Sequence, residues 1–202
     1  MLVIAPHPDD ETLGAGGLIA RQRIKGTDVI VAAVTDGENC YPDSVGMGEI
    51  RCLEQEAALK RLGVERDNIV RLRLPDSAVS SNEEELVERL MPLVSSDTHV
   101  VAPWSGDFHP DHEACGRAAT EVARRAGACL TFYFFWTWHR GTTQLISDLS
   151  LSSLPLDFQA LRAKTEALLH HWSQLARDSG DPILPDLLLV PARRPYEVFL
   201  VA

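Results

Sequence analysis

Residues 2–11 read L-V-I-A-P-H-P-D-D-E, a short apolar run that ends in a histidine, a proline and three acids. Residues 99–113 follow the same plan in H-V-V-A-P-W-S-G-D-F-H-P-D-H-E, so His-Pro-Asp also closes a second apolar run. The chain's own content of histidine, proline and aspartate predicts about 0.03 copies of this tripeptide by chance. Two copies at the ends of two apolar runs therefore indicate a shared role.

The proline in each copy predicts how the chain is arranged around it. Proline disfavours the helical conformation of the residue before it, so His7 and His109 are expected at strand ends. Each proline suits the first turn of a following helix, where the next acid faces the helix N-terminus. Ligands of open parallel sheets bind outside the carboxyl ends of the strands, so the two copies are expected to meet there. Adjacent residues in a first turn point about 100° apart, so Asp9 and Asp10 are expected to have different tasks.

Outward from these motifs, short β-branched runs alternate with helix-like segments along the chain. Strands are predicted at Leu2–Ala5, Val29–Thr35, Asn68–Leu72, His99–Pro103, Leu130–Phe135 and Glu197–Val201. Helices are predicted at Leu13–Lys25, Gly48–Leu62, Glu83–Val94, Glu113–Arg125 and Phe158–Ala176. Residues 36–47, 141–155 and 177–195 are predicted to be irregular. The order predicts an α/β fold, a mainly parallel sheet with helices on both faces in three α/β/α layers, and one domain over residues 1–202.

Composition and charge exclude several classes of protein. Hydrophobic residues make up 45% and charged residues 24%, which is typical of a packed globular domain. The formal charge is 19 − 29 = −10, so nucleic acid and anionic membrane surfaces are not expected partners. The longest apolar stretch, Cys129–Trp138, is about half as long as a membrane-spanning helix, and the N-terminus lacks a basic leader. The four cysteines form no C-x-x-C pair, so a reducing cytoplasm is the expected location.

The side chains gathered by the two motifs suit metal-assisted hydrolysis. Two histidines and a carboxylate are typical ligands of Zn²⁺, and a catalytic zinc keeps one position open. A free aspartate could then act as a general base, and a histidine held by an aspartate could stabilise an oxyanion. The residues alone leave open which side chains bind the metal. The candidates are His7, Asp9, Asp10, His109, Asp111 and His112.

Both motifs resemble those of the zinc-dependent N-deacetylases called PIG-L or LmbE-like, which remove acetyl groups from N-acetylglucosamine-type conjugates. The carriers are A-P-H-P-D-D-E-T-L-G at residues 5–14 and D-F-H-P-D-H-E-A at residues 107–114. Weaker agreement covers T-D-G-E at 35–38, R-x-x-E at 51–54, K-x-x-x-L at 164–168, H-x-S-Q at 171–174 and E-x-F at 197–199. The resemblance extends over nearly the whole chain and implies a Rossmann-like α/β domain.

Carried over position by position, the resemblance implies a role for each motif residue. The implied metal ligands are His7, Asp10 and His112. The implied cofactor is Zn²⁺, with another divalent ion such as Fe²⁺ or Co²⁺ as the alternative. Asp9 is the implied general base, His109 the electrophilic or acid group oriented by Asp111, and Arg51 a substrate contact. Some members carry a tyrosine shortly before the second motif, where this chain has Phe108, so the group that protonates the leaving amine is not assigned.

These features predict a cytoplasmic metal-dependent hydrolase that removes the acetyl group from an N-acetylated amino sugar or a related metabolite. Its expected partner is the small-molecule substrate, and the resemblance implies that the chain could form a homo-oligomer. One alternative is another metal-assisted amide or ester hydrolase. A second is a carbohydrate- or metal-binding module without turnover, which the presence of Asp9 and His109 disfavours because binding alone needs neither.

Several residues have a structural alternative beside the functional one. Asp9 and Asp10 could simply cap a helix. Arg51 and Glu54 have helical spacing and could form a solvated ion pair. Gly14, Gly16 and Gly17 do not complete a dinucleotide fingerprint, because position 19 is isoleucine, and are expected to allow close helix-to-sheet packing. The residues with both a core and a site alternative are His171, Trp104, Trp136 and Trp138.

Overall fold

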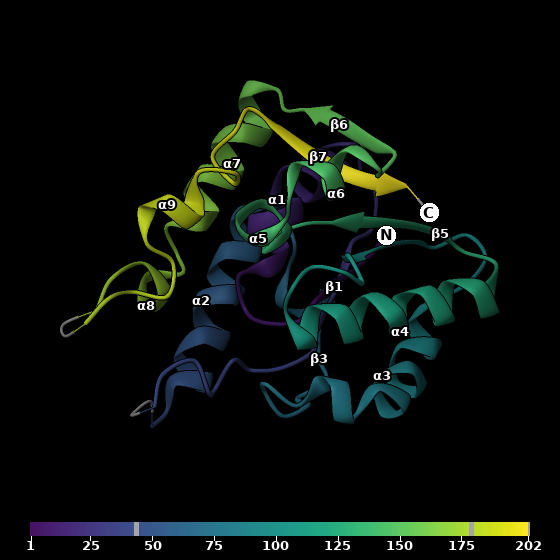
Figure 1. Cartoon of the computed structure of the whole chain (residues 1–202), viewed down its shortest axis with the longest axis horizontal. Helices are drawn as coiled ribbons and strands as arrows, with labels where there is room; N and C mark the ends of the chain where they lie inside the picture. Colours follow the sequence, from purple (N-terminus) through teal and green to yellow (C-terminus); the bar gives the residue numbers. More distant parts are fainter. Residues whose placement is uncertain (43–44, 178–179, 202) are drawn as a thin grey trace.

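The computed structural model describes residues 1–42, 45–177 and 180–201, and its centre is a seven-stranded sheet in the order β3-β2-β1-β4-β5-β7-β6 (Figure 1). The strands are β1 (Leu2–Ala5), β2 (Ile30–Ala33), β3 (Ile69–Arg71), β4 (His99–Pro103), β5 (Cys129–Tyr133), β6 (Leu151–Pro155) and β7 (Tyr196–Val201). The first five pair in parallel, whereas β7 pairs antiparallel with both β5 and β6. The predicted mainly parallel α/β sheet is confirmed.

Helices cover both faces of the sheet. They are α1 (Asp10–Ile24), α2 (Met47–Arg61), α3 (Glu83–Leu90), α4 (Pro110–Ala126), α5 (Thr137–Arg140), α6 (Thr143–Ser147), α7 (Phe158–Leu168), α8 (Trp172–Leu175) and α9 (Asp186–Leu189). Successive strand residues point to opposite faces, so Leu2 and Ile4 join the core under α3 and α4. Val3 and Ala5 join the core under α1, α2 and α7. The three-layer arrangement follows from this alternation, and Figure 1 shows α3 and α4 together, apart from α1, α2 and α7.

Three sequence-based expectations about the C-terminal half are wrong. Residues 141–155, predicted to be irregular, contain α6 and the edge strand β6. The sequence L-S-S-L-P has little β-branched character, and it becomes a strand because its backbone pairs with β7, with Ser153 opposite Val198. The helix predicted over residues 158–176 ends at Leu168, and α8 begins at Trp172. Residues 177–195, also predicted to be irregular, contain the short helix α9 (Asp186–Leu189). Positions 43–44 and 178–179 of the predicted irregular segments lie outside the described residues.

The two motif helices start differently. His109 is extended (φ −139°, ψ 126°) and Pro110 begins α4, as the proline rule predicts. The other helix begins at Asp10, so Pro8 lies before the first turn instead of in it. Asp9 is the residue that precedes the helix, with φ 151° and no capping hydrogen bond from its side chain. Capping is therefore not the task of the Asp9 carboxylate.

Helix α1 lies unusually close to its neighbours. A Cβ atom added at Gly14 would lie 2.2 Å from Tyr133 Cδ2, and one at Gly17 would lie 2.5 Å from Leu156. The expected close packing of the helix on the sheet is confirmed at Gly14, whereas Gly16 faces Lys164 of α7. No helix within the described ranges is long and apolar enough to cross a membrane.

A buried ion pair also fixes α1. Lys164 Nζ lies 2.7 Å from Glu197 Oε1 and donates to the Leu13 carbonyl at 3.0 Å. The Glu197 carboxylate in turn accepts the backbone N–H groups of Gly17 at 2.7 Å and Leu18 at 2.8 Å. These contacts hold the helix whose first turn carries Asp10.

Candidate metal centre and active site

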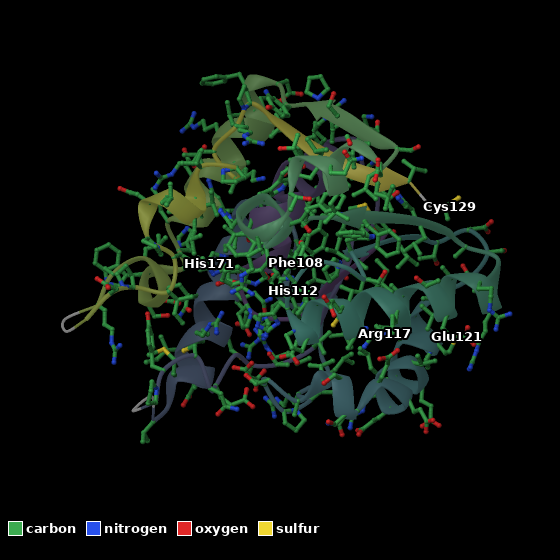
Figure 2. The ribbon with its side chains drawn as sticks, viewed as in Figure 1. Phe108, His112, Arg117, Glu121, Cys129 and His171 are labelled. Carbon is green, nitrogen blue, oxygen red and sulfur yellow. The ribbon has the colours of Figure 1, made fainter. Side chains whose placement is uncertain are left out.

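The two His-Pro-Asp copies meet at the carboxyl ends of β1 and β4, which are neighbours in the sheet. The ring centroid of His109 lies 5.0 Å from that of His7 and 4.9 Å from that of His112. A cavity of about 240 Å³ opens beside the three rings. Figure 2 labels His112 and Phe108, which belong to the segment that enters α4.

Three buried side chains in this cavity could hold a metal ion. Donor atoms of His7, Asp10 and His112 all lie within 4.8 Å of one another. Asp10 Oδ2 is 3.0 Å from His7 Nδ1 and 3.2 Å from His112 Nε2. The contact between His112 Nε2 and Asp10 lacks hydrogen-bond geometry, so this buried nitrogen has no hydrogen-bond partner among the described residues, which is unusual. A divalent ion would satisfy this atom, so the donor set fits a metal.

A second group of donors, from His7, His109 and Asp111, meets the same distance limit. The two groups share His7, so distance alone does not choose between them. The surroundings of His112 favour the first group, because its other ring nitrogen is held by a carboxylate.

That carboxylate belongs to Asp107, whose role the sequence analysis missed. Asp107 Oδ2 lies 2.9 Å from His112 Nδ1, and both side chains are fully buried. The same carboxylate accepts hydrogen bonds from the backbone N–H groups of Phe135, Trp136 and Thr137 and from the Thr137 hydroxyl. Metal-binding histidines commonly donate their second ring N–H to a carboxylate in this way. In the sequence, the position of Asp107 shortly after the fourth strand was the feature that could have indicated this role.

Asp9 and Asp10 point to different partners, as expected for neighbours at a helix start. Asp9 Oδ2 lies 3.2 Å from Arg51 Nη2, and both side chains are almost completely buried. Burial raises the pKa of Asp9 to about 7, although the Arg51 guanidinium opposes the shift. Asp9 is thus a carboxylate of higher basicity than usual. It lines the cavity without joining the first donor group.

Arg51 is a buried residue of the cavity wall and not part of a solvated ion pair. It donates to the Gly37 carbonyl at 3.0 Å and the Pro8 carbonyl at 3.2 Å, in addition to Asp9. Glu54 instead accepts the backbone N–H and hydroxyl of Ser173. The Nε atom of Arg51 is buried and has no partner among the described residues.

Asp111, which the resemblance implies to orient His109, contacts that ring through its backbone and not through its carboxylate. Asp111 holds His109 through its backbone N–H, which donates to Nδ1 at 3.3 Å. Its carboxylate lies 3.1 Å from His7 Nε2 and accepts the backbone N–H groups of Ser77 and Val79. The side chain turns this way because two N–H groups of the 77–79 turn face it. Burial, helped by nearby His112, lowers the pKa of His109 to about 4.

Asp76 is a second acid that the sequence analysis missed. Its Oδ1 lies 3.3 Å from His7 Nε2, and its Oδ2 accepts the Asn39 backbone N–H at 2.9 Å. Burial opposes ionisation, but the hydrogen bond with His7 lowers the pKa of Asp76 to about 2. The sequence feature that could have indicated Asp76 is L-P-D-S, which places an acid just after the third strand. The carboxyl end of that strand faces the same edge of the sheet.

Backbone strain is concentrated around the site. Among the described residues, four non-glycine residues have positive φ. Asp9 and Ser77 line the cavity, and Phe108 directly precedes the lining residue His109. The fourth is Arg73. Such conformations are held only where surrounding contacts determine them, and they are common at functional sites.

The remaining candidates divide between core and site. Trp136 lines the cavity, whereas Trp104 and Trp138 pack edge-on against Phe134. His171 does not line the cavity, is 1% exposed, and lies 3.2 Å from the Thr12 hydroxyl. The geometry therefore favours a core role for His171 over a role in the site.

Comparison with known proteins identifies the class of this chain. The family model described as PIG-L, GlcNAc-PI de-N-acetylase, matches residues 2–123. The chain belongs to this family.

Similar proteins carry related names. The chain is 31% identical over 136 residues to the probable N-acetyl-alpha-D-glucosaminyl L-malate deacetylase 2 of Bacillus subtilis (strain 168), covering 62% of this chain and 61% of that protein. It is 31% identical over 135 residues to the diacetylchitobiose deacetylase of Thermococcus kodakarensis, covering 63% of this chain and 50% of that protein. The matches thus span between half and two thirds of these curated relatives.

Solved structures share the fold. The N,N'-diacetylchitobiose deacetylase from Pyrococcus horikoshii superposes with a TM-score of 0.74 at 23% identity, over 100% of this chain and 82% of that one. The zinc-inhibited form of teicoplanin deacetylase Orf2 gives a TM-score of 0.79 at 18% identity, over 99% and 96% of the two chains. At these identities the likeness concerns the fold.

Proposed function

We propose that this protein is a metal-dependent N-deacetylase that hydrolyses the acetamide of an N-acetylated amino sugar, releasing acetate and a free amine. The observation that carries the proposal is a three-residue donor group beside two further groups suited to proton transfer and oxyanion binding, all within one cavity. The deacetylase names of the relatives support the substrate class.

His7, Asp10 and His112 would hold the ion, which we propose to be Zn²⁺, with Fe²⁺ or Co²⁺ as alternatives. A divalent ion held there would supply a Lewis acid for the acetyl carbonyl and for water. The protein supplies the remaining groups of the reaction.

Asp9 is the proposed general base. It accepts a proton from the attacking water, and its raised pKa of about 7 matches that task near neutral pH. Arg51 holds the carboxylate in place through the contact at 3.2 Å. Arg51 also lines the cavity, and we propose that it contacts substrate there.

His109 is the proposed oxyanion donor. Its Nδ1 accepts the Asp111 N–H, so the neutral ring carries its proton on Nε2. An N–H in this position can donate to the oxygen that becomes negative when water adds to the carbonyl. Asp111 takes a positioning role, through its backbone for His109 and through its carboxylate for His7.

We also propose a cytoplasmic, single-domain protein over residues 1–202 whose partner is the small-molecule substrate, with homo-oligomer formation as a further possibility to test. The cysteines support a reducing location, because Cys40, Cys52, Cys115 and Cys129 are all free thiols. The formal charge of −10 opposes binding to nucleic acid and to anionic membranes.

Incubation of the metal-replete protein with a panel of N-acetylated sugars and simple esters tests the proposal. We expect equal amounts of acetate and free amine from at least one sugar, and loss of both products after chelation. Cleavage of esters alone would favour the alternative that the protein is a metal-assisted ester hydrolase. Tight metal and sugar binding without product would favour a binding module and reject the proposed activity.

A further inference from the structure

Residues 135–140, which we call the clamp segment, hold the chain that carries the second motif. The backbone N–H groups at its start bind the Asp107 carboxylate, as described above. At its other end, Arg140 Nη1 donates to the Phe108 carbonyl at 2.6 Å. Phe108 has φ 57°, so this hydrogen bond holds a strained residue that directly precedes His109.

The clamp segment also contacts the His109 ring. Trp136 stacks with His109 at an interplanar angle of 14° and a centroid distance of 6.1 Å. The Arg140 guanidinium lies 4.0 Å from the centre of the Trp136 ring, within the range of a cation–π interaction. Arg140 therefore contacts both the stacking partner of His109 and the residue before it.

His109 depends on such packing for its orientation. Among the described residues, its ring makes a single hydrogen bond, the long one of 3.3 Å from the Asp111 N–H. One hydrogen bond at Nδ1 leaves the ring free to tilt about that contact, and small errors of position in a catalytic group are costly in rate. A flat, fixed neighbour removes that freedom.

We propose that Arg140 is a positioning residue of the deacetylation reaction, acting on His109 through the Trp136 ring and the Phe108 carbonyl. The inference rests on the proposed function. Arg140 itself is exposed and lies outside the residues that line the cavity, so its substitution leaves core and donor groups in place.

The chain offers a matched control. Arg194 places its guanidinium 5.5 Å from the ring of Trp138, which belongs to the same helix α5 as Arg140. Trp138 packs against Phe134. Arg194→Met thus removes an arginine–tryptophan contact close to the site, and none of the described contacts joins Arg194 directly to His109 or Trp136.

The test compares kcat, KM and metal content. We expect Arg140→Met to lower kcat about 10-fold, to change KM less than about 3-fold, and to keep the metal content of the wild type. Arg140→Lys should recover much of the loss, since it retains a charge and a donor for the Phe108 carbonyl. Arg194→Met should turn over like the wild type. In the His109→Ala background, Arg140→Met should cost less than about 2-fold, because its effect passes through His109.

A spectroscopic measurement gives a readout without turnover. The emission of Trp136 is obtained for each metal-free protein by subtracting the spectrum of the same protein that also carries Trp136→Phe. This emission should shift in Arg140→Met and stay unchanged in Arg194→Met.

The inference is overturned if Arg140→Met leaves kcat and the Trp136 emission unchanged, if Arg194→Met loses as much, or if the loss persists in full without His109. Absence of acetate release by the metal-replete wild type on every substrate would instead reject the proposed function, and the catalytic role of Arg140 with it.

Discussion

Asp9 and Asp10 are adjacent and have the same side chain, but their carboxylates face different partners. Asp10 lies between two histidine nitrogens, whereas Asp9 lies against Arg51. We expect Asp9→Asn to keep the metal and lose about 10²- to 10⁴-fold in kcat, because the proton acceptor is gone. Asp10→Asn should lose metal and recover activity with excess Zn²⁺. Elemental analysis and turnover of both variants decide this, and rescue of Asp9→Asn by zinc would exchange the two roles.

Asp107 is the residue on which the orientation of His112 depends. Asp107→Asn replaces the anionic partner of His112 Nδ1 by a neutral amide, so we expect the metal affinity to fall about 10- to 100-fold. Competition with a chelating dye measures this change. The exposed Asp186, which pairs only with Arg193 among the described contacts, supplies the control Asp186→Asn. Equal affinities of the two variants would contradict the role of Asp107.

At the scale of elements, the ion pair of Lys164 and Glu197 joins α7 and β7 to α1. Lys164→Met leaves a buried carboxylate without its cation, so the free energy of unfolding should fall by about 3–5 kcal/mol. Arg162→Met, on the same helix, breaks an exposed pair with Glu166 and should cost less than about 1 kcal/mol. Urea denaturation compares the free energies of unfolding of the two variants. Similar losses would show that the buried pair does not stabilise the position of α1.

The break between α7 and α8 contains His171, whose burial lowers its pKa to about 3. The folded state then binds fewer protons than the unfolded state between about pH 6.5 and 3, so this residue's contribution to stability is complete above pH 6.5 and is lost as the pH falls. We expect His171→Gln to flatten the decline of the unfolding free energy by up to about 1 kcal/mol per pH unit. His170→Gln, at the exposed neighbouring position, is the matched control. Identical slopes for both variants would refute the assignment.

At the scale of the whole molecule, the metal should stabilise the fold, because its ligands come together only in the native state. A ligand present at 100 times its Kd contributes about 2.7 kcal/mol, so reloading chelated protein should raise Tm by about 5–10 °C. Differential scanning calorimetry with and without Zn²⁺ measures the shift. His112→Ala, which lacks one of the proposed donors, should show little response. A shift as large as that of the wild type would place the ion elsewhere.

The sequence by itself determined the parts of this protein that depend on neighbours along the chain. Proline acts on the residue before it, so the extended backbone of His109 could be predicted, although His109 lies six residues beyond the last residue of β4, Pro103, and not at the strand end as expected. The period of apolar residues predicted the parallel strands. The rule that parallel strands present their carboxyl ends at one edge brought the two His-Pro-Asp copies together. The motifs then indicated the family that the comparison confirmed.

Only the tertiary structure decided which groups face one another across the sheet. Asp111 turns to His7 because the N–H groups of the 77–79 turn meet it, and no spacing in the sequence reports the direction of those groups. Asp107 reaches His112 because the start of the clamp segment binds its carboxylate, and β6 forms because β7 returns beside it. Such contacts join residues tens of positions apart, and their geometry depends on strand order and backbone orientation, which local propensity does not encode.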